Sequence, residues 1–257
     1  MKRIVVKVGS NVLTTDAGKL DITRMSALVD QIAWLRWHGY EVILVSSGAV
    51  ACGRRELHID HHLDSVEQRQ LFSAIGQVKL VNLYYDLFRE YNIHIGQVLT
   101  MKEHFLSEKS YNTQRQCMEV MLENSVLPIV NENDTVSVDE LMFTDNDELS
   151  GLISQMMGAE TLILLTNVDG IYTGDPSLPD SKVIREVKAE DSLEQYISTS
   201  KSSAGRGGME SKYNTARKVA EAGISVIIAN GNKENILRQL VEEPETTIHT
   251  VFLPKGR

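Results

Sequence analysis

Two lysines, each beside glycine residues, are the first candidates for chemistry in this 257-residue chain. Lys7 lies inside the apolar run 4–8 and is followed by Gly9-Ser10-Asn11. A lysine in a buried strand costs free energy unless an anion meets it, and glycine lets a ligand approach the backbone. Lys212 ends a second glycine-rich segment, 204–212. The pair favours two cationic contacts with one polyphosphate, although Lys7 alone could also be an edge-strand lysine whose ammonium extends to solvent.

Acidic residues gather in the middle of the chain. No Lys or Arg occurs between Arg115 and Lys182, whereas the acids there include Glu132, Asp134, Asp139, Glu140, Asp145, Asp147 and Glu148. A solvated acidic surface would explain this pattern. Because these acids flank the ends of predicted strands and helices, a site for a cation or an ammonium group is the competing interpretation.

The elements that must position these residues alternate between short β-branched runs and longer amphipathic stretches. The pattern predicts strands over 4–8, 41–45, 93–99, 127–130, 161–165, 225–229 and 246–253, and helices over 21–37, 67–89, 107–123, 147–157, 210–222 and 234–240. A hairpin is predicted over 136–143, a long loop over 166–179, and Asp147 as the N-cap of its helix.

Strands separated by helices predict an α/β fold with a mostly parallel central sheet covered on both faces. Ligands then bind at the carboxyl ends of the strands, here the polar segments 9–10, 46–49, 131–134 and 166–167. We expect residues 1–257 to form one domain, with an N-terminal lobe over about 1–155 and a C-terminal lobe over about 156–257.

Composition excludes several classes of protein. The net charge of −9 argues against non-specific binding to nucleic acid. Two cysteines imply no disulfide framework and favour a reducing cytoplasm, and we expect Cys52 to pack as a small apolar side chain. No apolar run is long enough to span a membrane, and Lys7 and Gly9 interrupt any signal-peptide core. We therefore expect a cytoplasmic protein that binds neither nucleic acid nor membranes.

Common catalytic and metal-binding motifs are missing. The sequence contains no Walker A motif, no GxGxxG after a strand, no HExxH, no paired CxxC and no GxSxG. Its seven histidines show no ligand spacing, and His61-His62 lies in a polar stretch. We predict no protein-bound metal centre.

The segments at the predicted strand ends, taken in order, resemble the amino acid kinase family. Asn131-Glu132-Asn133-Asp134 and Asp145-Asn146-Asp147 are the most specific pair of motifs, and they resemble those of members that phosphorylate L-glutamate. The other matching segments are 7–10, 44–49, 164–167, 170–176 and 207–212. Together they span essentially the whole chain.

The resemblance implies a three-layer α/β/α sandwich and transfer of the γ-phosphoryl group of ATP to the side-chain carboxylate of L-glutamate. The product would be γ-glutamyl phosphate, made in the first step of proline biosynthesis. Phosphoryl transfer between two anions needs alignment and neutralisation of charge, here by lysines and by Mg²⁺ bound mainly through the nucleotide phosphates. No general base is needed, because a carboxylate is already ionised near neutral pH.

The resemblance also implies a role for each matching residue. Lys7 and Lys212 would contact the phosphates, and Asp147 would orient both lysines. The acceptor would be bound by Ser47, Gly48, Asp134 and Asn146, and Asp145 would support this site or contact the acceptor. ATP would be bound by Lys7, Gly9, Ser10, Thr166, Asn167, Arg206, Gly207, Gly208, Met209, Glu210, Ser211 and Lys212.

Two positions depart from the family pattern. Asn167 stands where family members often carry Asp, and Arg206 stands where they usually carry a small hydroxyl residue. These departures concern nucleotide contacts rather than the chemistry. Arg206 could meet a phosphate or point to solvent.

Two alternatives remain open at the level of sequence. The chain could phosphorylate N-acetylglutamate or another small acceptor, although the acidic segment favours a free amino group. It could also be an amino-acid sensor of the same fold that does not consume ATP. From the resemblance we further expect a homo-oligomer, inhibition by proline, and a γ-glutamyl phosphate reductase as a partner. Many bacterial members continue into a small C-terminal PUA domain, which we do not find in these 257 residues, so we infer no nucleic-acid role.

Overall fold

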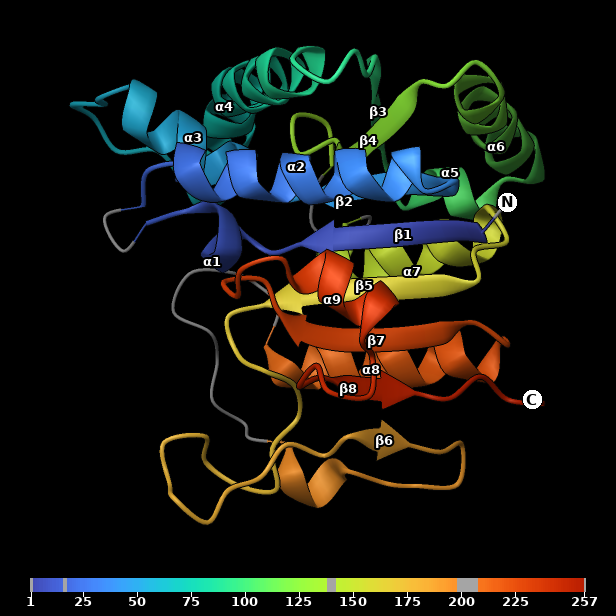
Figure 1. Cartoon of the computed structure of the whole chain (residues 1–257). Helices are drawn as coiled ribbons and strands as arrows, with labels where there is room; N and C mark the ends of the chain where they lie inside the picture. Colours follow the sequence, from blue (N-terminus) through green and yellow to red (C-terminus); the bar gives the residue numbers. More distant parts are fainter. Residues whose placement is uncertain (1, 16–17, 138–141, 198–207, 257) are drawn as a thin grey trace.

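Eight strands form one twisted sheet in the order β3-β4-β2-β1-β5-β7-β8-β6 (Figure 1). The computed structural model describes residues 2–15, 18–137, 142–197 and 208–256. The strands are β1 Lys2–Val8, β2 Tyr40–Ser46, β3 Ile95–Thr100, β4 Leu127–Glu132, β5 Thr161–Thr166, β6 Glu186–Val187, β7 Ser225–Asn230 and β8 Thr250–Phe252. Neighbouring strands run parallel, except that β8 is antiparallel to β7. The predicted mostly parallel sheet is confirmed.

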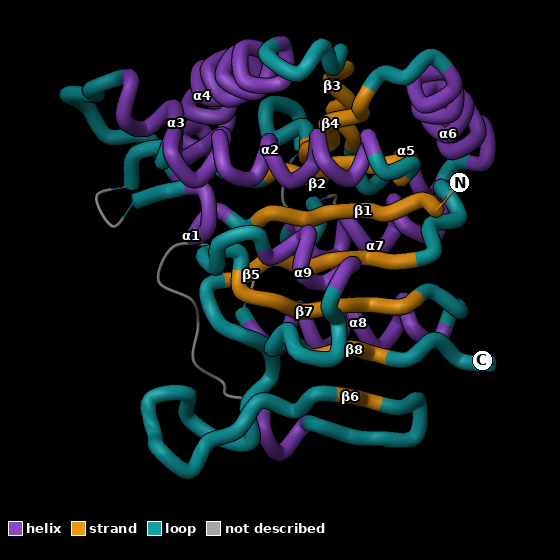
Figure 2. Tube along the Cα trace, viewed as in Figure 1, coloured by secondary structure: helices purple, strands orange, loops and turns teal. Residues whose placement is uncertain are grey.

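Helices cover both faces of the sheet and give the predicted three-layer sandwich (Figure 2). They are α1 Ser10–Leu13, α2 Ile22–Trp37, α3 Ala49–Glu56, α4 Ser65–Arg89, α5 Glu103–Leu106, α6 Glu108–Glu123, α7 Asn146–Met156, α8 Met209–Glu221 and α9 Ile236–Glu242. Successive strand residues point to opposite faces. Val6 belongs to the core cluster that includes residues of α2, α4 and α9, whereas Val5 belongs to the cluster that includes residues of α6, α7 and α8. Both strand faces are buried, which explains the continuous apolar runs.

Several local predictions were wrong. The predicted hairpin shows no strand in its described residues: 136 lies in a turn, 142 lies in a bend, 137 and 143 have no regular structure, and 138–141 lie outside the described residues. The predicted strand 246–253 is paired only over Thr250–Phe252. The N-cap of α7 is Asp145 rather than Asp147, because the Asp145 side chain accepts from the backbone amides of Asp147 and Glu148. The short helices α1, α3 and α5 were not predicted, since fewer than three turns show little periodicity.

Helices α3 and α4 pack unusually close to each other. A Cβ added to Gly53 would lie 1.8 Å from the backbone oxygen of Phe72, and one added to Gly76 would lie 1.8 Å from that of Ala49. Only glycine fits at these two positions without moving a helix. The contact fixes the start of α3, which follows directly from the end of β2.

Candidate active site

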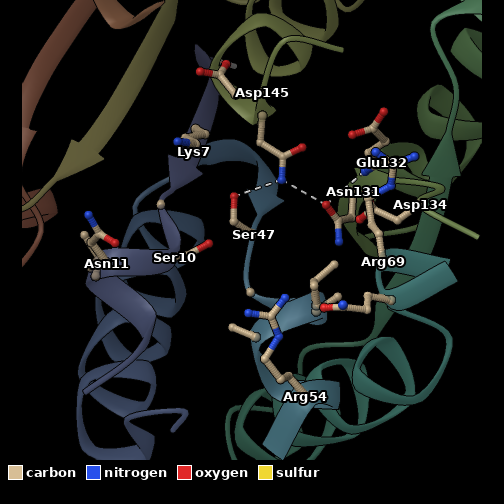
Figure 3. Close-up of a pocket in the computed structure, with 18 of the residues that line it drawn as sticks. Lys7, Ser10, Asn11, Ser47, Arg54, Arg69, Asn131, Glu132, Asp134 and Asp145 are labelled. Atoms are coloured by element: carbon tan, nitrogen blue, oxygen red, sulfur yellow. Dashed lines mark hydrogen bonds and ion pairs between the residues drawn. The ribbon is translucent and has the colours of Figure 1, made fainter. Parts of the chain in front are cut away.

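A cavity of about 840 Å³ opens at the carboxyl ends of β1, β2, β4 and β5 (Figure 3). Ten of the residues predicted from the sequence line this cavity: Lys7, Gly9, Ser10, Ser47, Gly48, Asp134, Asp145, Asn146, Thr166 and Lys212. Segments far apart in sequence therefore meet at one edge of the sheet, as a doubly covered parallel sheet requires.

The deepest charged group is Asp147, which bridges the two predicted lysines. Lys7 Nζ lies 2.5 Å from Asp147 Oδ1, and Lys212 Nζ lies 2.9 Å from Oδ2. All three residues are buried, and Asp147 is fully inaccessible. The two ammonium groups line the cavity while the carboxylate lies behind them. The Asp147 carboxylate therefore contacts both ammonium groups and is itself not exposed to the cavity.

The charge state of Asp147 follows from these contacts. Burial by itself raises the pKa of this carboxyl, but the nearby ammonium groups of Lys7 and Lys212 outweigh burial and hold the pKa below its ordinary value. Its position in the first turn of α7 also favours a negative charge. One carboxylate balances only one of the two lysines, so these three groups together carry a net positive charge.

A chain of amide hydrogen bonds fixes the orientation of Asn146. Its Nδ2 donates to Ser47 Oγ at 2.8 Å and to Asn131 Oδ1 at 2.9 Å (dashed lines in Figure 3). Both amide hydrogens are thereby used. Among the described residues no donor is assigned to Asn146 Oδ1, so this oxygen is the group that can accept a hydrogen bond from a ligand.

Asp134 lies at the same end of the cavity, where helix α4 holds the segment around it. Arg69 Nε is 3.8 Å from Asp134 Oδ1, and Arg69 Nη2 donates to the backbone oxygen of Ser137 at 2.7 Å. Gln70 Nε2 donates to the backbone oxygen of Thr135 at 2.9 Å. An amide oxygen and a carboxylate at one end of a cavity are suitable acceptors for an ammonium group.

Gly48 is the glycine of this site whose backbone conformation excludes other residues. Its φ is +108°, and it is the N-cap of α3. This conformation places the Ser47 side chain and the first amides of α3 at the cavity. In contrast, a Cβ on Gly9 would make only ordinary contacts, the nearest being Lys7 Nζ at 3.5 Å.

Five further residues predicted to bind the nucleotide are described and do not line the cavity. Asn167 is exposed after the end of β5, Gly208 is the N-cap of α8, and Met209, Glu210 and Ser211 form the first turn of that helix. None of these five lines the cavity. Arg206 and Gly207 lie outside the described residues.

Sequence reasoning missed two residues of α4 that support the site. Arg69, near the start of the helix, lines the cavity, whereas Gln77, in its middle, lies behind the lining residues. A polar residue in a long helix usually marks the solvent face. Asn131 was also missed, although it belongs to the Asn-Glu-Asn-Asp motif, which was the available signal for it.

Asp169, Asn230 and Lys233 form a polar group that joins the ends of β5 and β7. Asp169 Oδ1 is 2.9 Å from both Asn230 Nδ2 and Lys233 Nζ. Burial raises the pKa of Asp169, but these partners outweigh burial and lower it overall.

The structure also bears on the metal centre, the membrane span and the cysteines considered from the sequence. Among the described residues, no cluster of three or more His, Cys, Asp or Glu side chains could hold a metal ion. The helices described here include none with the length and apolar character needed to cross a membrane. Cys52 is buried, as predicted, and Cys117 is exposed.

Comparison with known proteins gives consistent matches. The model of the amino acid kinase family matches residues 2–230. Glutamate 5-kinase from Bacteroides thetaiotaomicron is 63% identical over 252 residues, covering 98% of this chain and 70% of that protein. The enzyme of the same name from Chlorobaculum tepidum is 46% identical, covering 93% of this chain and 66% of that protein. The one from Symbiobacterium thermophilum is 41% identical, covering 99% of this chain and 97% of that protein.

Solved structures with the same architecture are more distant in sequence. Carbamate kinase from Giardia lamblia bound to AMP-PNP superposes with a TM-score of 0.70 at 15% identity, covering 98% of both chains. UMP kinase from Ureaplasma parvum superposes with a TM-score of 0.66 at 15% identity, covering 98% of this chain and all of that one. At this identity the similarity concerns the fold alone.

Proposed function

The chain belongs to the amino acid kinase family, and we propose that it transfers the γ-phosphoryl group of ATP to the side-chain carboxylate of L-glutamate. The observation that carries the proposal is the pair of buried lysines, Lys7 and Lys212, held by Asp147 at the floor of a cavity whose far end carries acceptors for an ammonium group. The relatives named glutamate 5-kinase support the choice of substrate.

The lysines supply the electrostatic part of the reaction. The acceptor carboxylate and the phosphates are both anionic, so their approach is unfavourable without fixed positive charge. Asp147 holds both ammonium groups fixed in direction before the ligands bind. Because both lysines line the cavity, Lys7 and Lys212 would stabilise negative charge on the phosphoryl group as it passes between its two oxygens.

Recognition of the acceptor is assigned to Asp134, Asn146 and the turn at Ser47-Gly48. The ammonium group of glutamate would donate to Asp134 and to Asn146 Oδ1, which both accept hydrogen bonds. An N-acetyl group would remove the positive charge and leave a single donor for two acceptors, which costs affinity at a buried polar site. The site therefore favours glutamate over N-acetylglutamate.

The nucleotide is assigned to the region around Gly9-Ser10, Thr166 and the start of α8. Mg²⁺ would bind mainly through the nucleotide phosphates and neutralise their charge, a role that suits the lack of a carboxylate cluster among the described residues. On this assignment the acceptor is bound mostly by residues of about 1–155, and the nucleotide mostly by residues of about 156–257.

The family resemblance supports three further proposals. The chain would form a homo-oligomer, proline would inhibit it, and a reductase would consume the acyl phosphate, which is a labile product. Its free cysteines suit a reducing cytoplasm. Size-exclusion chromatography with light scattering tests the first of these proposals directly.

Trapping of the product with hydroxylamine tests the proposed reaction. Purified protein is incubated with ATP, Mg²⁺ and hydroxylamine, with L-glutamate or N-acetylglutamate in parallel and Lys7→Ala as the control. We expect γ-glutamyl hydroxamate from glutamate alone, lost in the variant. Product from N-acetylglutamate instead would overturn the substrate assignment, and glutamate binding without product or ATP consumption would identify a sensor.

A further inference from the structure

Helix α4 contributes a buried glutamine to the hydrogen bonds that orient the acceptor site. Gln77 Oε1 accepts from Asn131 Nδ2 at 2.9 Å, and both side chains are buried. Asn131 Oδ1 in turn accepts from Asn146 Nδ2 and from the backbone amide of Glu132, each at 2.9 Å. The order Gln77, Asn131, Asn146 therefore joins the middle of α4 to a residue that faces the cavity.

We propose that Gln77 is a positioning residue for the acceptor, because it fixes the Asn131 amide that in turn orients the carbonyl oxygen of Asn146 toward the ligand. The inference rests on the proposed function and deepens it, by naming a residue that sets the preference for a primary ammonium group. Gln77 does not line the cavity, so any effect on the ligand passes through Asn131 and Asn146.

The hydrogen-bonding capacity of each amide makes the orientation directional. With Gln77 Oε1 in place, the Asn131 amide nitrogen is bound toward α4 and its oxygen faces Asn146. That oxygen engages one hydrogen of Asn146 Nδ2, and Ser47 Oγ engages the other. Without Gln77, the buried amide nitrogen of Asn131 loses its hydrogen-bond acceptor. Rotation of the Asn131 side chain toward the cavity is then favoured, because water there can accept this hydrogen bond. Asn146 is then free to rotate and present its NH₂ group, a donor, where the ammonium needs an acceptor.

Gly76, the residue before Gln77, brings the same part of α4 against the start of α3, on the other side of the site. Gly76 allows the backbone oxygen of Ala49 to approach so closely that a Cβ would lie 1.8 Å from it. Two consecutive residues of α4 thus support the first residue of α3, which follows the turn at Ser47-Gly48, and the Asn131–Asn146 amides. This part of α4 therefore contacts two of the segments that line the acceptor site.

The test compares Gln77→Met with Gln77→Glu and with a matched control. Methionine keeps the length of the side chain but cannot accept the amide hydrogen bond, whereas the carboxylate of glutamate can. Gln31→Met is the control, because Gln31 is similarly buried, accepts from the backbone amide of Leu237 and lies in α2, away from the cavity. Steady-state constants for glutamate, N-acetylglutamate and ATP are measured for each protein, together with thermal midpoints.

For Gln77→Met we expect the KM for glutamate to rise about tenfold while kcat and the KM for ATP change by less than about twofold. The preference for glutamate over N-acetylglutamate should fall with it, and Gln77→Glu should restore most of the glutamate KM. Gln31→Met should lower the thermal midpoint without changing the glutamate KM.

An unchanged glutamate KM in Gln77→Met, in an otherwise active wild-type background, would overturn this inference alone. An equal rise in KM in Gln31→Met would do the same, by showing a general effect of lost stability. A wild-type protein that makes no product from glutamate would instead overturn the proposed function, and with it the substrate on which this inference depends.

Discussion

The ammonium group of Lys7 lies 2.5 Å from the carboxylate of Asp147, and both side chains are almost completely buried. A lysine at the end of a core strand needs a counter-charge, because moving an isolated ammonium out of water is unfavourable. Asp147 supplies this charge from the first turn of α7 and shares it with Lys212. The anion that accounts for the buried lysine is thus part of the protein, and the ligand meets a centre that is already assembled.

Replacing Lys7 by alanine removes one of the two fixed positive charges that face the cavity. We expect Lys7→Ala to lower kcat by about 10²–10³-fold, the range typical for loss of one charge-stabilising donor. The glutamate KM should change little, because the ammonium-binding end of the site is intact. Steady-state kinetics by the hydroxamate assay measures both, with the exposed Lys2 of the same strand replaced by alanine as the control. A Lys7→Ala variant with unchanged kcat would contradict the role given to this lysine.

Stability should depend on pH through Asp147. Its pKa is lowered in the folded protein, so its ion pairs stabilise the fold above the unfolded-state pKa, and this contribution is lost as the pH falls below about 4. Asp147→Asn leaves two buried ammonium groups without a counter-charge and should destabilise the protein by about 3–5 kcal/mol near neutral pH. The difference from wild type should shrink as the pH is lowered through 4 toward 3.

Urea denaturation from pH 7 down to pH 3 measures this difference. Asp180→Asn is a suitable control, because Asp180 is exposed and its side chain makes no hydrogen bond or ion pair with the described residues. If the difference in unfolding free energy between wild type and Asp147→Asn stays constant over the whole pH range, Asp147 is not the titrating group.

The sequence indicated the centre of the site because the key residues break a local pattern. Lys7 interrupts an apolar run, and Asp134 and Asn146 follow strand and helix boundaries where motifs are readable. Gln77 and Arg69 give no such signal, since a polar residue in a long helix usually faces solvent. Their partners, Asn131 and Asp134, lie on other segments, and only the folded arrangement shows that this face of α4 is turned inward.

Arg69 should affect binding of glutamate rather than turnover. Its guanidinium contacts the Asp134 carboxylate and the backbone oxygen of Ser137, so Arg69→Met releases the segment that carries an acceptor for the ammonium group. We expect the glutamate KM to rise by about 5–20-fold, with kcat nearly unchanged. Arg69→Lys should restore part of the effect, because a lysine keeps the charge but cannot make both contacts.

Kinetic constants for the two Arg69 variants test this expectation. Arg89→Met, at the exposed end of the same helix, is the control. Equal glutamate KM values in wild type and Arg69→Met would exclude a role for Arg69 in holding Asp134.

Asn167→Asp should act on the nucleotide alone. Asn167 is exposed beyond the end of β5 and does not line the cavity that carries the acceptor residues. We expect a changed preference among nucleoside triphosphates and an unchanged glutamate KM. Saturation curves for glutamate, at fixed ATP, check the second part, and a shifted glutamate curve would contradict it.

The pattern of strands was predictable because a parallel sheet buried on both faces leaves long apolar runs. The packing of α3 on α4 was not, because Gly53 and Gly76 look like ordinary glycines until the two helices are seen to cross there. The N-cap of α7 was assigned two residues late, since Asp145 and Asp147 are both good capping residues and only the backbone amides distinguish them.

Gly76→Ala tests whether this close helix contact sets the acceptor site. The added methyl group would lie 1.8 Å from the backbone oxygen of Ala49, so α3 must move away from α4. Alanine favours the helix by about 1 kcal/mol over glycine, but overpacking should dominate and leave a net loss of about 1–3 kcal/mol. Because Gly48 is the N-cap of α3, the same shift should raise the glutamate KM. Urea denaturation and kinetics measure both effects, with Val78→Ala on the exposed face of α4 as the control. A Gly76→Ala variant with wild-type stability and glutamate KM would show that the site does not depend on this contact.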